Sequence, residues 1–292
     1  MKQKSGRRSG GVIGKICWTV LFLPVFLGLC LLANLVLLLL VFPSKIWPVA
    51  CLKINAVLGE AVAVLLWEFF TKILGLSFRT ENTAGLSPSS RFLLIANHIW
   101  AFDFLLVNRL ADKIHRLDSL RYTLKEPLAH IPLLGPIFSA LGYVFLSRDK
   151  TKDRGRVKEK IAFYEKTGLG YGVVLFPEGT RYTPQKQRLS AKYAKRNRLP
   201  VLKNVLLPHT GAFFEAASAM KKAGAKTIIC ATLLCRDRKT KKRHVPCFWD
   251  VLRLEDLVFR AKIQKRYLGS VPDTRKEAGC WLRTLFANVF DF

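Results

Sequence analysis

Hydrophobic and polar positions divide the chain into an apolar N-terminal part and a mixed remainder. Residues 16–42 form a run of 27 residues without a charged side chain. About 20 apolar residues cross the hydrocarbon core of a bilayer, so this run predicts a retained membrane element, with tilt or a bend at Pro24 taking up the extra length. Residues 46–78 are also apolar but contain four charged side chains. This second stretch predicts either a weaker span or an amphipathic helix in the interface.

The pattern changes after residue 80. Short apolar runs predict strands, and stretches with helical spacing lie between them. The predicted strands are residues 92–96, 143–146, 172–176, 205–207 and 227–234, and the predicted helices are residues 102–110, 157–164, 213–222 and 273–286. A period-two pattern at residues 259–264 predicts a further edge or late strand. This alternation predicts an α/β domain with a largely parallel sheet flanked by helices.

These patterns divide the chain into a basic N-terminal tail at residues 1–15, membrane-embedded helices at residues 16–78 and an α/β domain at residues 79–292. The tail contains five basic side chains and no acidic one, which favours the cytoplasmic side of a membrane. One crossing would then place the domain in the lumen. Two crossings or a re-entrant hairpin would return it to the cytosol, and the sequence leaves both topologies open.

The net charge of the chain is extreme, at +28. Nucleic acid and an anionic membrane are the two partners that suit such a charge. Two runs are especially basic: residues 183–200, which we predict to be a long loop, and residues 236–243. Tyr193 is the only aromatic residue in these runs, so the stacking platforms of single-strand-binding proteins are missing. We therefore expect a lipid bilayer and anionic substrates as partners, and no nucleic acid.

The seven cysteines do not predict a disulfide framework, because their number is odd and no Cys-x-x-Cys pair occurs. Cys230, Cys235, His244 and Cys247 could be combined into a metal site on paper. Their spacing differs from the usual zinc-finger spacings, and the first two lie in an apolar run, where small buried thiols are common. We expect no metal.

A histidine and an aspartate follow the first predicted strand. His98 lies just after the apolar run at residues 92–96, and Asp103 comes five residues later. A histidine that acts as a base needs a partner that fixes its other ring nitrogen. Residues five apart on one helix point about 140° apart, so the two meet only if the chain turns after Ala96 and a helix begins near Ala101. From this stretch alone, a catalytic pair and two capping residues are equally good interpretations.

A second motif, Phe-Pro-Glu-Gly-Thr-Arg at residues 176–181, also follows an apolar run directly. Ligands bind at the carboxyl ends of strands in open α/β sheets. Gly179 permits a tight turn and a close backbone approach. Arg181 offers a planar fork for a phosphate, and Glu178 could hold that arginine or a substrate hydroxyl. Taken alone, the motif is better explained as a plain surface turn.

Three further residues lie at the ends of apolar runs. Lys125 follows the short run at residues 121–124, and Arg148 ends the run at residues 142–148. Each offers a cation for a phosphate. Pro208 ends the third such run.

Together these motifs resemble the glycerolipid acyltransferases, the family of 1-acylglycerol-3-phosphate acyltransferases and related lysophospholipid acyltransferases. The resemblance rests on His-x4-Asp, a strand that ends in an arginine, Phe-Pro-Glu-Gly-Thr-Arg and an apolar strand that ends in proline, in this order over residues 80–215. An N-terminal membrane element is also expected for this family. Residues 121–150 and 199–208 look most similar to the subgroup that includes lysocardiolipin acyltransferase.

The resemblance implies an acyl-CoA-dependent O-acyltransferase in which His98 is the general base and Asp103 orients it. His98 would take the proton from a glycerol hydroxyl, which attacks the thioester of acyl-CoA directly. Neither motif contains a serine or cysteine nucleophile, which suits direct transfer. The residues implied to bind the acceptor's glycerol phosphate are Glu178, Gly179, Thr180, Arg181, Arg148 and Lys125, and Pro208 is implied to shape the acyl site. Acyl-CoA is a co-substrate, and no further cofactor is implied.

The identity of the acceptor stays open. Lysophosphatidic acid is the simplest choice, and lysocardiolipin and lysophosphatidylinositol are the alternatives. The lysocardiolipin subgroup usually has Arg-Thr-Lys-Gly-Phe after the proline, where this chain has His-Thr-Gly-Ala-Phe at residues 209–213, so two basic groups are missing. The resemblance further implies an integral protein of the endoplasmic reticulum membrane.

Two other classes of function are weighed against this one. A membrane-anchored nucleic-acid-binding protein is supported by charge alone. A catalytically inactive lipid-binding scaffold is disfavoured, because the residues of both motifs are intact.

Overall fold

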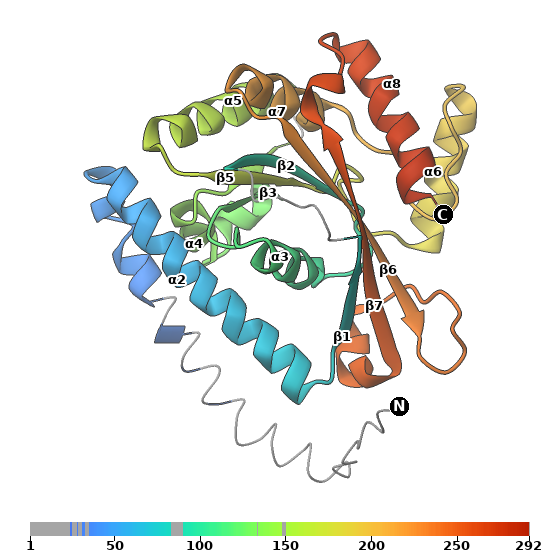
Figure 1. The fold of residues 1–292 in the computed structure, drawn as a ribbon, viewed down its shortest axis with the longest axis horizontal. Helices are drawn as coiled ribbons and strands as arrows, with labels where there is room; N and C mark the ends of the chain where they lie inside the picture. Colours follow the sequence, from blue (N-terminus) through green and yellow to red (C-terminus); the bar gives the residue numbers. More distant parts are fainter. Residues whose placement is uncertain are drawn as a thin grey trace.

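Seven strands form one twisted sheet with helices on both faces (Figure 1). The computed structural model describes residues 24, 28, 31–32, 35–82, 90–132, 134–147 and 150–291. In spatial order the strands are β1 (Ser77–Glu81), β7 (Leu257–Tyr267), β6 (Thr227–Asp237), β2 (Arg91–Ala96), β5 (Tyr171–Leu175), β3 (Leu120–Lys125) and β4 (Val144–Leu146). Every pairing between them is parallel except that of β6 with β7. The predicted α/β fold with a largely parallel sheet is confirmed.

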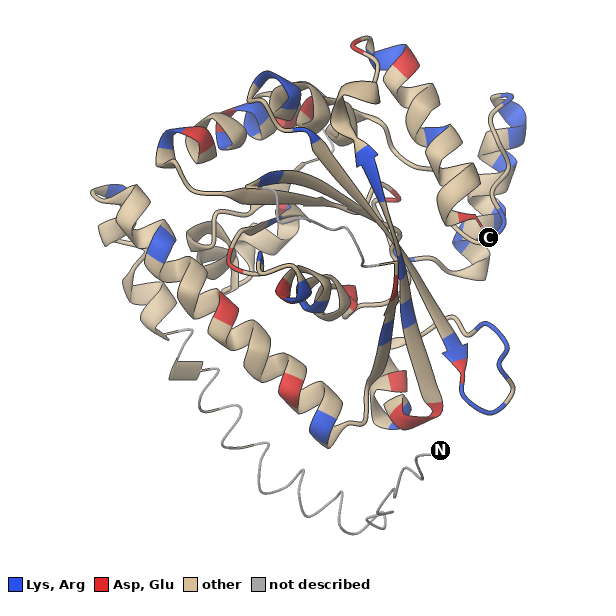
Figure 2. Cartoon of the chain, viewed as in Figure 1, with Lys and Arg blue, Asp and Glu red and all other residues tan. Residues whose placement is uncertain are grey.

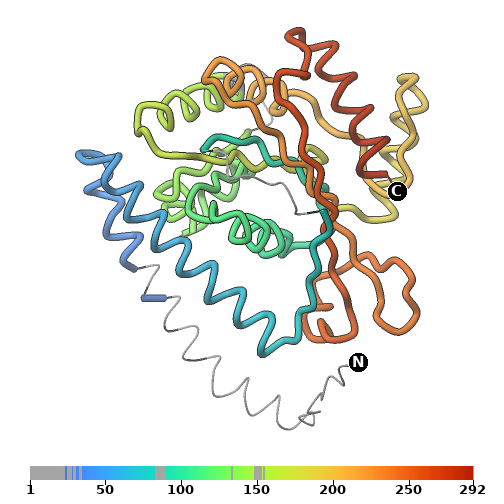
Figure 3. The backbone as a smooth tube through the Cα atoms, in the orientation of Figure 1, coloured from blue at the N-terminus to red at the C-terminus, as the bar shows by residue number. Residues whose placement is uncertain are grey.

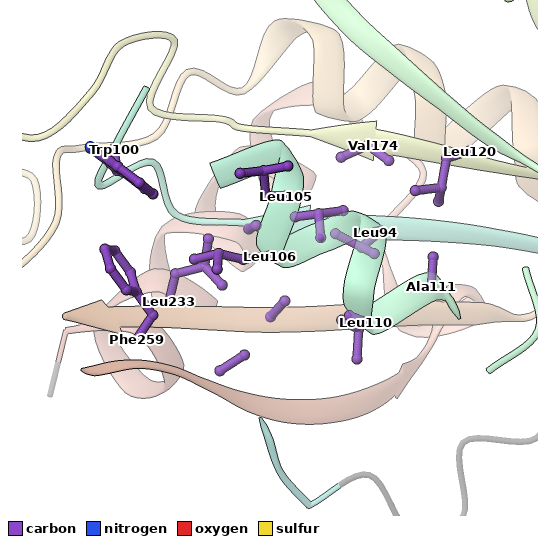
Figure 4. Packing of buried hydrophobic residues seen from close by; sticks show 14 of the residues in the cluster. Leu94, Trp100, Leu105, Leu106, Leu110, Ala111, Leu120, Val174, Leu233 and Phe259 are labelled. Atoms are coloured by element: carbon purple, nitrogen blue, oxygen red, sulfur yellow. The ribbon is translucent and has the colours of Figure 1, made fainter. Parts of the chain in front are cut away.

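The central strand β2 is buried on both faces, which explains its unbroken apolar run. Leu94 faces a cluster that includes α3 (Asp103–Lys113) and the end of α2 (Pro48–Glu68). Leu93 and Ile95 face a second cluster, to which α5 (Lys150–Thr167), α7 (Gly211–Lys222) and α8 (Arg275–Leu285) contribute. Figure 4 shows the first cluster, in which the leucines of α3 lie over the sheet.

The helix α2 continues through the π-helical turn η2 (Phe69–Ile73), and together they span 26 residues. In the part of the chain that the structure describes, this is the one helix long and apolar enough to cross a membrane. It packs along the same side of the sheet as α3 and leads directly into β1 (Figure 3). Ile54 and Val57 on its outer side are exposed. The predicted element at residues 16–42 falls mostly outside the described residues, and so does the tail at residues 1–15.

Short helices complete the chain. They are η1 (Pro43–Lys45), η3 (Glu126–His130), α4 (Leu134–Ala140), η4 (Phe248–Asp256), η5 (Leu268–Ser270) and η6 (Phe286–Phe290).

The prediction of a long loop at residues 183–200 is wrong, because residues 184–196 form the helix α6 (Pro184–Arg196). Thr183 caps it by accepting the Lys186 N–H at 3.2 Å, and Pro184 occupies its first turn, as is common at helix starts. The basic side chains that suggested a loop are spread over the exposed surface of an amphipathic helix.

The predicted strand at residues 205–207 is also wrong. The backbone N–H of Leu206 donates to Glu178 Oε1 at 2.6 Å, and that of Leu207 donates to Ser190 Oγ at 2.9 Å. Both donors are therefore used by side chains, and this apolar segment is held as a buried loop.

The predicted late strand at residues 259–264 is confirmed as β7, but it is not an edge strand. It lies between β6 and β1, and β1 occupies the edge. The sequence did not reveal β1, because this strand overlaps the end of the apolar stretch at residues 46–78.

The close packing of β5 against β2 gives a stability prediction. Gly172 pairs with Phe92, and a Cβ atom at Gly172 would overlap the Phe92 ring. Gly172→Ala should therefore lower the free energy of unfolding by about 1–3 kcal/mol, as overpacking of a core does. The measurement is thermal unfolding in detergent. Gly211→Ala, at an open position at the start of α7, is the control and should leave the midpoint unchanged or raise it. Equal midpoints for both variants would contradict the prediction.

Candidate active site

The carboxyl ends of β2, β5, β3 and β4 lie at one edge of the sheet, because these strands are parallel. His98 follows β2, residues 176–181 follow β5, and Lys125 is the exposed last residue of β3. The Tyr182 N–H donates to the His98 carbonyl at 2.7 Å, so the two motifs meet directly. Arg148, the fourth predicted strand-end residue, lies outside the described residues.

His98 and Asp103 form a hydrogen-bonded pair, with 2.8 Å between His98 Nδ1 and Asp103 Oδ2. The chain turns over residues 97–102 and α3 begins at Asp103, as the pairing requires. Asp103 Oδ2 also accepts the N–H groups of Ile99 at 2.7 Å and Trp100 at 3.0 Å. In a neutral ring, this carboxylate therefore holds the proton on Nδ1 and leaves Nε2 as a free base.

The surroundings of the two side chains differ. Asp103 is only 1% exposed, whereas the His98 side chain is 24% exposed. Burial raises the pKa of Asp103, and the hydrogen bonds from His98 and from the two backbone N–H groups act against this rise. The arrangement buries the orienting group and keeps the base open to a substrate.

Two buried residues that the sequence analysis did not assign hold this turn in place. Asn97 donates to the Leu233 carbonyl at 2.9 Å and accepts the Leu233 N–H at 2.6 Å. Trp100 stacks on Phe259, with 4.9 Å between ring centroids, and its Nε1 donates to the Cys247 carbonyl at 2.8 Å. Asn97 directly precedes the first motif and Trp100 lies inside it, but their partners are more than 130 positions away, so no local pattern identifies these roles.

Glu178 is buried beneath the first motif. Its Oε2 accepts the His98 N–H, and its Oε1 accepts the Leu206 N–H at 2.6 Å. Burial raises the pKa of Glu178 to about 8, while the two N–H groups act to lower it. The predicted role of this residue in acceptor binding stays untested. The structure shows a carboxyl group whose two oxygens hold the backbone of two loops.

The rest of the second motif turns outward. Gly179 has a φ of +65°, and a Cβ atom there would lie 3.1 Å from the ring of His209, so the turn needs glycine. Thr180 Oγ1 accepts from Lys186 Nζ at 2.7 Å. Arg181 is exposed, and among the described residues no side chain forms an ion pair with its guanidinium.

Basic side chains that the sequence analysis did not assign surround this turn. Lys186 comes from the first turn of α6, in the stretch predicted as a loop, and His209 follows the buried Pro208. The His209 N–H donates to the Pro177 carbonyl at 2.8 Å, which places the predicted acyl-site segment directly against the second motif. Arg243 lies over the Tyr182 ring at 4.9 Å. The sequence signal for Arg243 is its place in the basic run at residues 236–243.

A second histidine–aspartate pair fixes the segment that holds Trp100 of the first motif. His244 Nε2 lies 2.6 Å from Asp250 Oδ2. Burial acts to raise the pKa of Asp250, but hydrogen bonds from His244, the Cys247 N–H and Arg253 outweigh it and lower the pKa to about 2. This carboxylate therefore stays charged and fixes the segment whose carbonyl holds Trp100. Within the described residues, no three His, Cys, Asp or Glu side chains gather into a metal-binding group.

The model of one protein family, described as Acyltransferase, matches residues 77–233, which include both motifs. The chain belongs to the acyltransferase family. The family-level resemblance is thereby confirmed, and the likeness to the lysocardiolipin subgroup stays a prediction.

Curated relatives of this chain include a probable 1-acyl-sn-glycerol-3-phosphate acyltransferase 5 of Arabidopsis thaliana, 29% identical over 67% of this chain and 51% of the relative. The 1-acyl-sn-glycerol-3-phosphate acyltransferase gamma of Homo sapiens is 27% identical over 82% of this chain and 64% of the relative. The chain thus spans about half to two thirds of the length of these relatives. A crystal structure of the 1-acyl-sn-glycerophosphate acyltransferase PlsC of Thermotoga maritima matches with a TM-score of 0.47 and 15% identity, over 86% of this chain and 92% of the other.

The buried Glu178 carboxyl gives a prediction for the dependence of stability on pH. Its pKa is about 8 in the folded chain against an ordinary value of 4.5, so between these values the folded chain holds a proton that the unfolded chain has released. Raising the pH through this range therefore favours unfolding, by up to about 1.4 kcal/mol per pH unit.

Glu178→Gln cannot titrate and should remove this part of the pH dependence, although it loses one backbone hydrogen bond. Thermal unfolding of both chains between about pH 5 and pH 9 measures the two slopes. Parallel slopes for the parent and the variant would contradict the prediction.

Proposed function

We propose that this acyltransferase moves a fatty acyl group from acyl-CoA to the free hydroxyl of a lysophospholipid, with lysophosphatidic acid as the acceptor and phosphatidic acid as the product. One observation carries the proposal: Asp103 holds the proton of His98 on Nδ1 and leaves Nε2 free in a partly open site. Membership of the acyltransferase family and the names of the curated relatives support the acceptor class.

In the proposed reaction, His98 Nε2 takes the proton of the glycerol hydroxyl while the hydroxyl oxygen attacks the thioester carbon of acyl-CoA. The resulting imidazolium is stabilised by the Asp103 carboxylate. Collapse of the tetrahedral intermediate breaks the C–S bond, and the CoA sulfur takes the proton back from His98. The base is regenerated, and no acyl-enzyme forms.

The turn after β5 suits the acceptor's phosphate. Arg181 is exposed and without an internal ion pair among the described residues, and Lys186 and His209 border the same turn. Arginine binds phosphate through two parallel hydrogen bonds. We assign the glycerol phosphate to this group of basic side chains, with Lys125 at the neighbouring strand end.

A bilayer fits the apolar helix formed by α2 and η2. Its length and composition suffice for a crossing, its outer side is apolar, and the proposed product is itself a bilayer lipid. The proposal includes integral membrane association and, from the family resemblance, the endoplasmic reticulum.

The decisive experiment incubates the purified full chain with labelled acyl-CoA and a panel of lysophospholipids and identifies the products. His98→Ala should reduce transfer by at least about 1,000-fold, because it removes the group that acts as the general base and positions the attacking hydroxyl. His115→Asn replaces an exposed histidine outside the site and should retain full activity. Full activity of His98→Ala would refute the mechanism.

Arg181→Ala should raise KM for the lysophospholipid by about tenfold or more, the usual effect of losing a charge-assisted hydrogen bond. The KM for acyl-CoA should change little. Arg196→Ala, in the exposed last turn of α6, is the matched control. An unchanged acceptor KM in Arg181→Ala would mean that the phosphate binds elsewhere.

A further inference from the structure

A second group of arginines lies at the corner of the sheet where β1, β7 and the end of β6 meet. The parallel register of β1 and β7 places Arg79 directly beside Arg260. Arg236 of β6 pairs with Val258, two residues before Arg260, so all three arginines share one face of the sheet. Phe259, on the opposite face, is buried in the core. Figure 2 shows the basic positions on these strands and on the turn that follows β6.

These strands and the turn line a partly open cavity of about 180 Å³, at which Arg79, Arg236 and Lys241 are exposed. Five cationic side chains line it, against a single carboxylate: Arg79, Arg236, Arg238, Lys241, Arg260 and Asp237. A water molecule takes about 30 Å³ in the liquid, so the cavity has room for a phosphate group and several waters.

Within the described part of the chain, the charge of this cavity is only partly neutralised, by an ion pair between Arg260 and Glu81. Asp237 Oδ1 accepts the N–H groups of Lys239 at 2.9 Å and Thr240 at 2.7 Å, so its carboxylate is turned to the backbone of its own turn. Arg238 Nε donates to a carbonyl, that of Glu255, at 2.7 Å.

Arg79 and Arg260, which lie side by side, show this incomplete neutralisation most clearly. Arg260 reaches Glu81 only at 3.4 Å, and its buried Nε has no partner among the described residues. Arg79 and Arg236 form no ion pair with any described residue. Like charges directly opposite each other on neighbouring strands are destabilising, so an anion between them would relieve a cost built into the sheet.

We propose that this cavity binds a phosphate group. Arginine side chains that converge from two strands match the geometry of phosphate oxygens. The phosphate comes from one of two sources, the nucleotide part of CoA or the head group of a phospholipid.

The place of the cavity suits both sources. Ala96 of β2 pairs with Ala231 of β6, so Arg236 lies five residues, or about 16 Å, beyond the end of the catalytic strand. The turn after β6 returns through Arg243, which bridges to Arg236 and contacts Tyr182 next to His98. On the other side, Glu255 packs against Gly75, just after η2, so the cavity also adjoins the end of the apolar helix.

The test uses the full chain in neutral detergent at constant ionic strength, with inorganic phosphate as the first probe. Arg79→Gln combined with Arg260→Gln removes the paired charges. Arg266→Gln is the control, because Arg266 lies on the same face of β7 at its other end and is exposed.

Phosphate should raise the midpoint of thermal unfolding of the parent and of the control equally, and should have little effect on the double variant. Without phosphate, the double variant should be at least as stable as the parent, because the like-charge contact is gone. Equal phosphate effects in all three chains would overturn the proposal.

Two further arms distinguish the sources. In calorimetric titrations, the double variant should bind CoA about tenfold more weakly than the parent if the nucleotide is the source, and dephospho-CoA shows whether the 3′-phosphate is the group bound. If a phospholipid is the source, the loss should appear with nanodiscs that contain phosphatidic acid and not with phosphatidylcholine alone. Unchanged affinity in both arms would overturn the proposal. Only the CoA arm rests on the proposed function, so a failure of acyl transfer would leave the phosphate measurement valid.

Discussion

The active site depends on one buried carboxyl group, that of Glu178. It accepts the backbone N–H groups of His98, in the loop after β2, and of Leu206, in the loop between α6 and α7. A buried carboxyl group without such partners would be costly, so the position of each loop is fixed by the need to satisfy it. Gly179 and His209 then meet beside it. The second motif therefore acts first as the internal support of the first motif.

Two carboxyl groups thus hold His98 from different directions. Asp103 fixes the ring through Nδ1, and Glu178 fixes the backbone. Burial raises the pKa of both groups, but their consequences differ. In the proposed reaction Asp103 must stay ionised to stabilise an imidazolium, and the backbone N–H groups of Ile99 and Trp100, just before α3, act to lower its pKa. Glu178 needs only to accept hydrogen bonds, and its raised pKa keeps a second negative charge away from the base near neutral pH.

The sequence predicted most of the sheet, because parallel central strands are continuous apolar runs that need no partner to be recognised. It also gave the condition under which His98 and Asp103 can meet, a turn after Ala96 followed by a helix, and the structure has this turn. The strand predicted around Leu206 is a loop, because a side chain takes the place of a neighbouring strand as hydrogen-bond partner. The edge strand β1 was not predicted, because it overlaps the end of an apolar stretch. The hydrogen bonds between Asn97 and Leu233 could not be predicted from the sequence, because the two residues lie far apart in the chain.

Around His98, negative and positive side chains are separated by burial. The acidic side chains next to His98, Asp103 and Glu178, are buried, whereas the neighbouring basic side chain of Arg181 is exposed. A substrate that approaches this edge of the sheet therefore meets a positive field, and an anionic substrate is drawn in. Beside the base, the negative charge is supplied by Asp103, whose carboxylate lies 2.8 Å from the ring and stabilises the imidazolium that the proposed reaction requires.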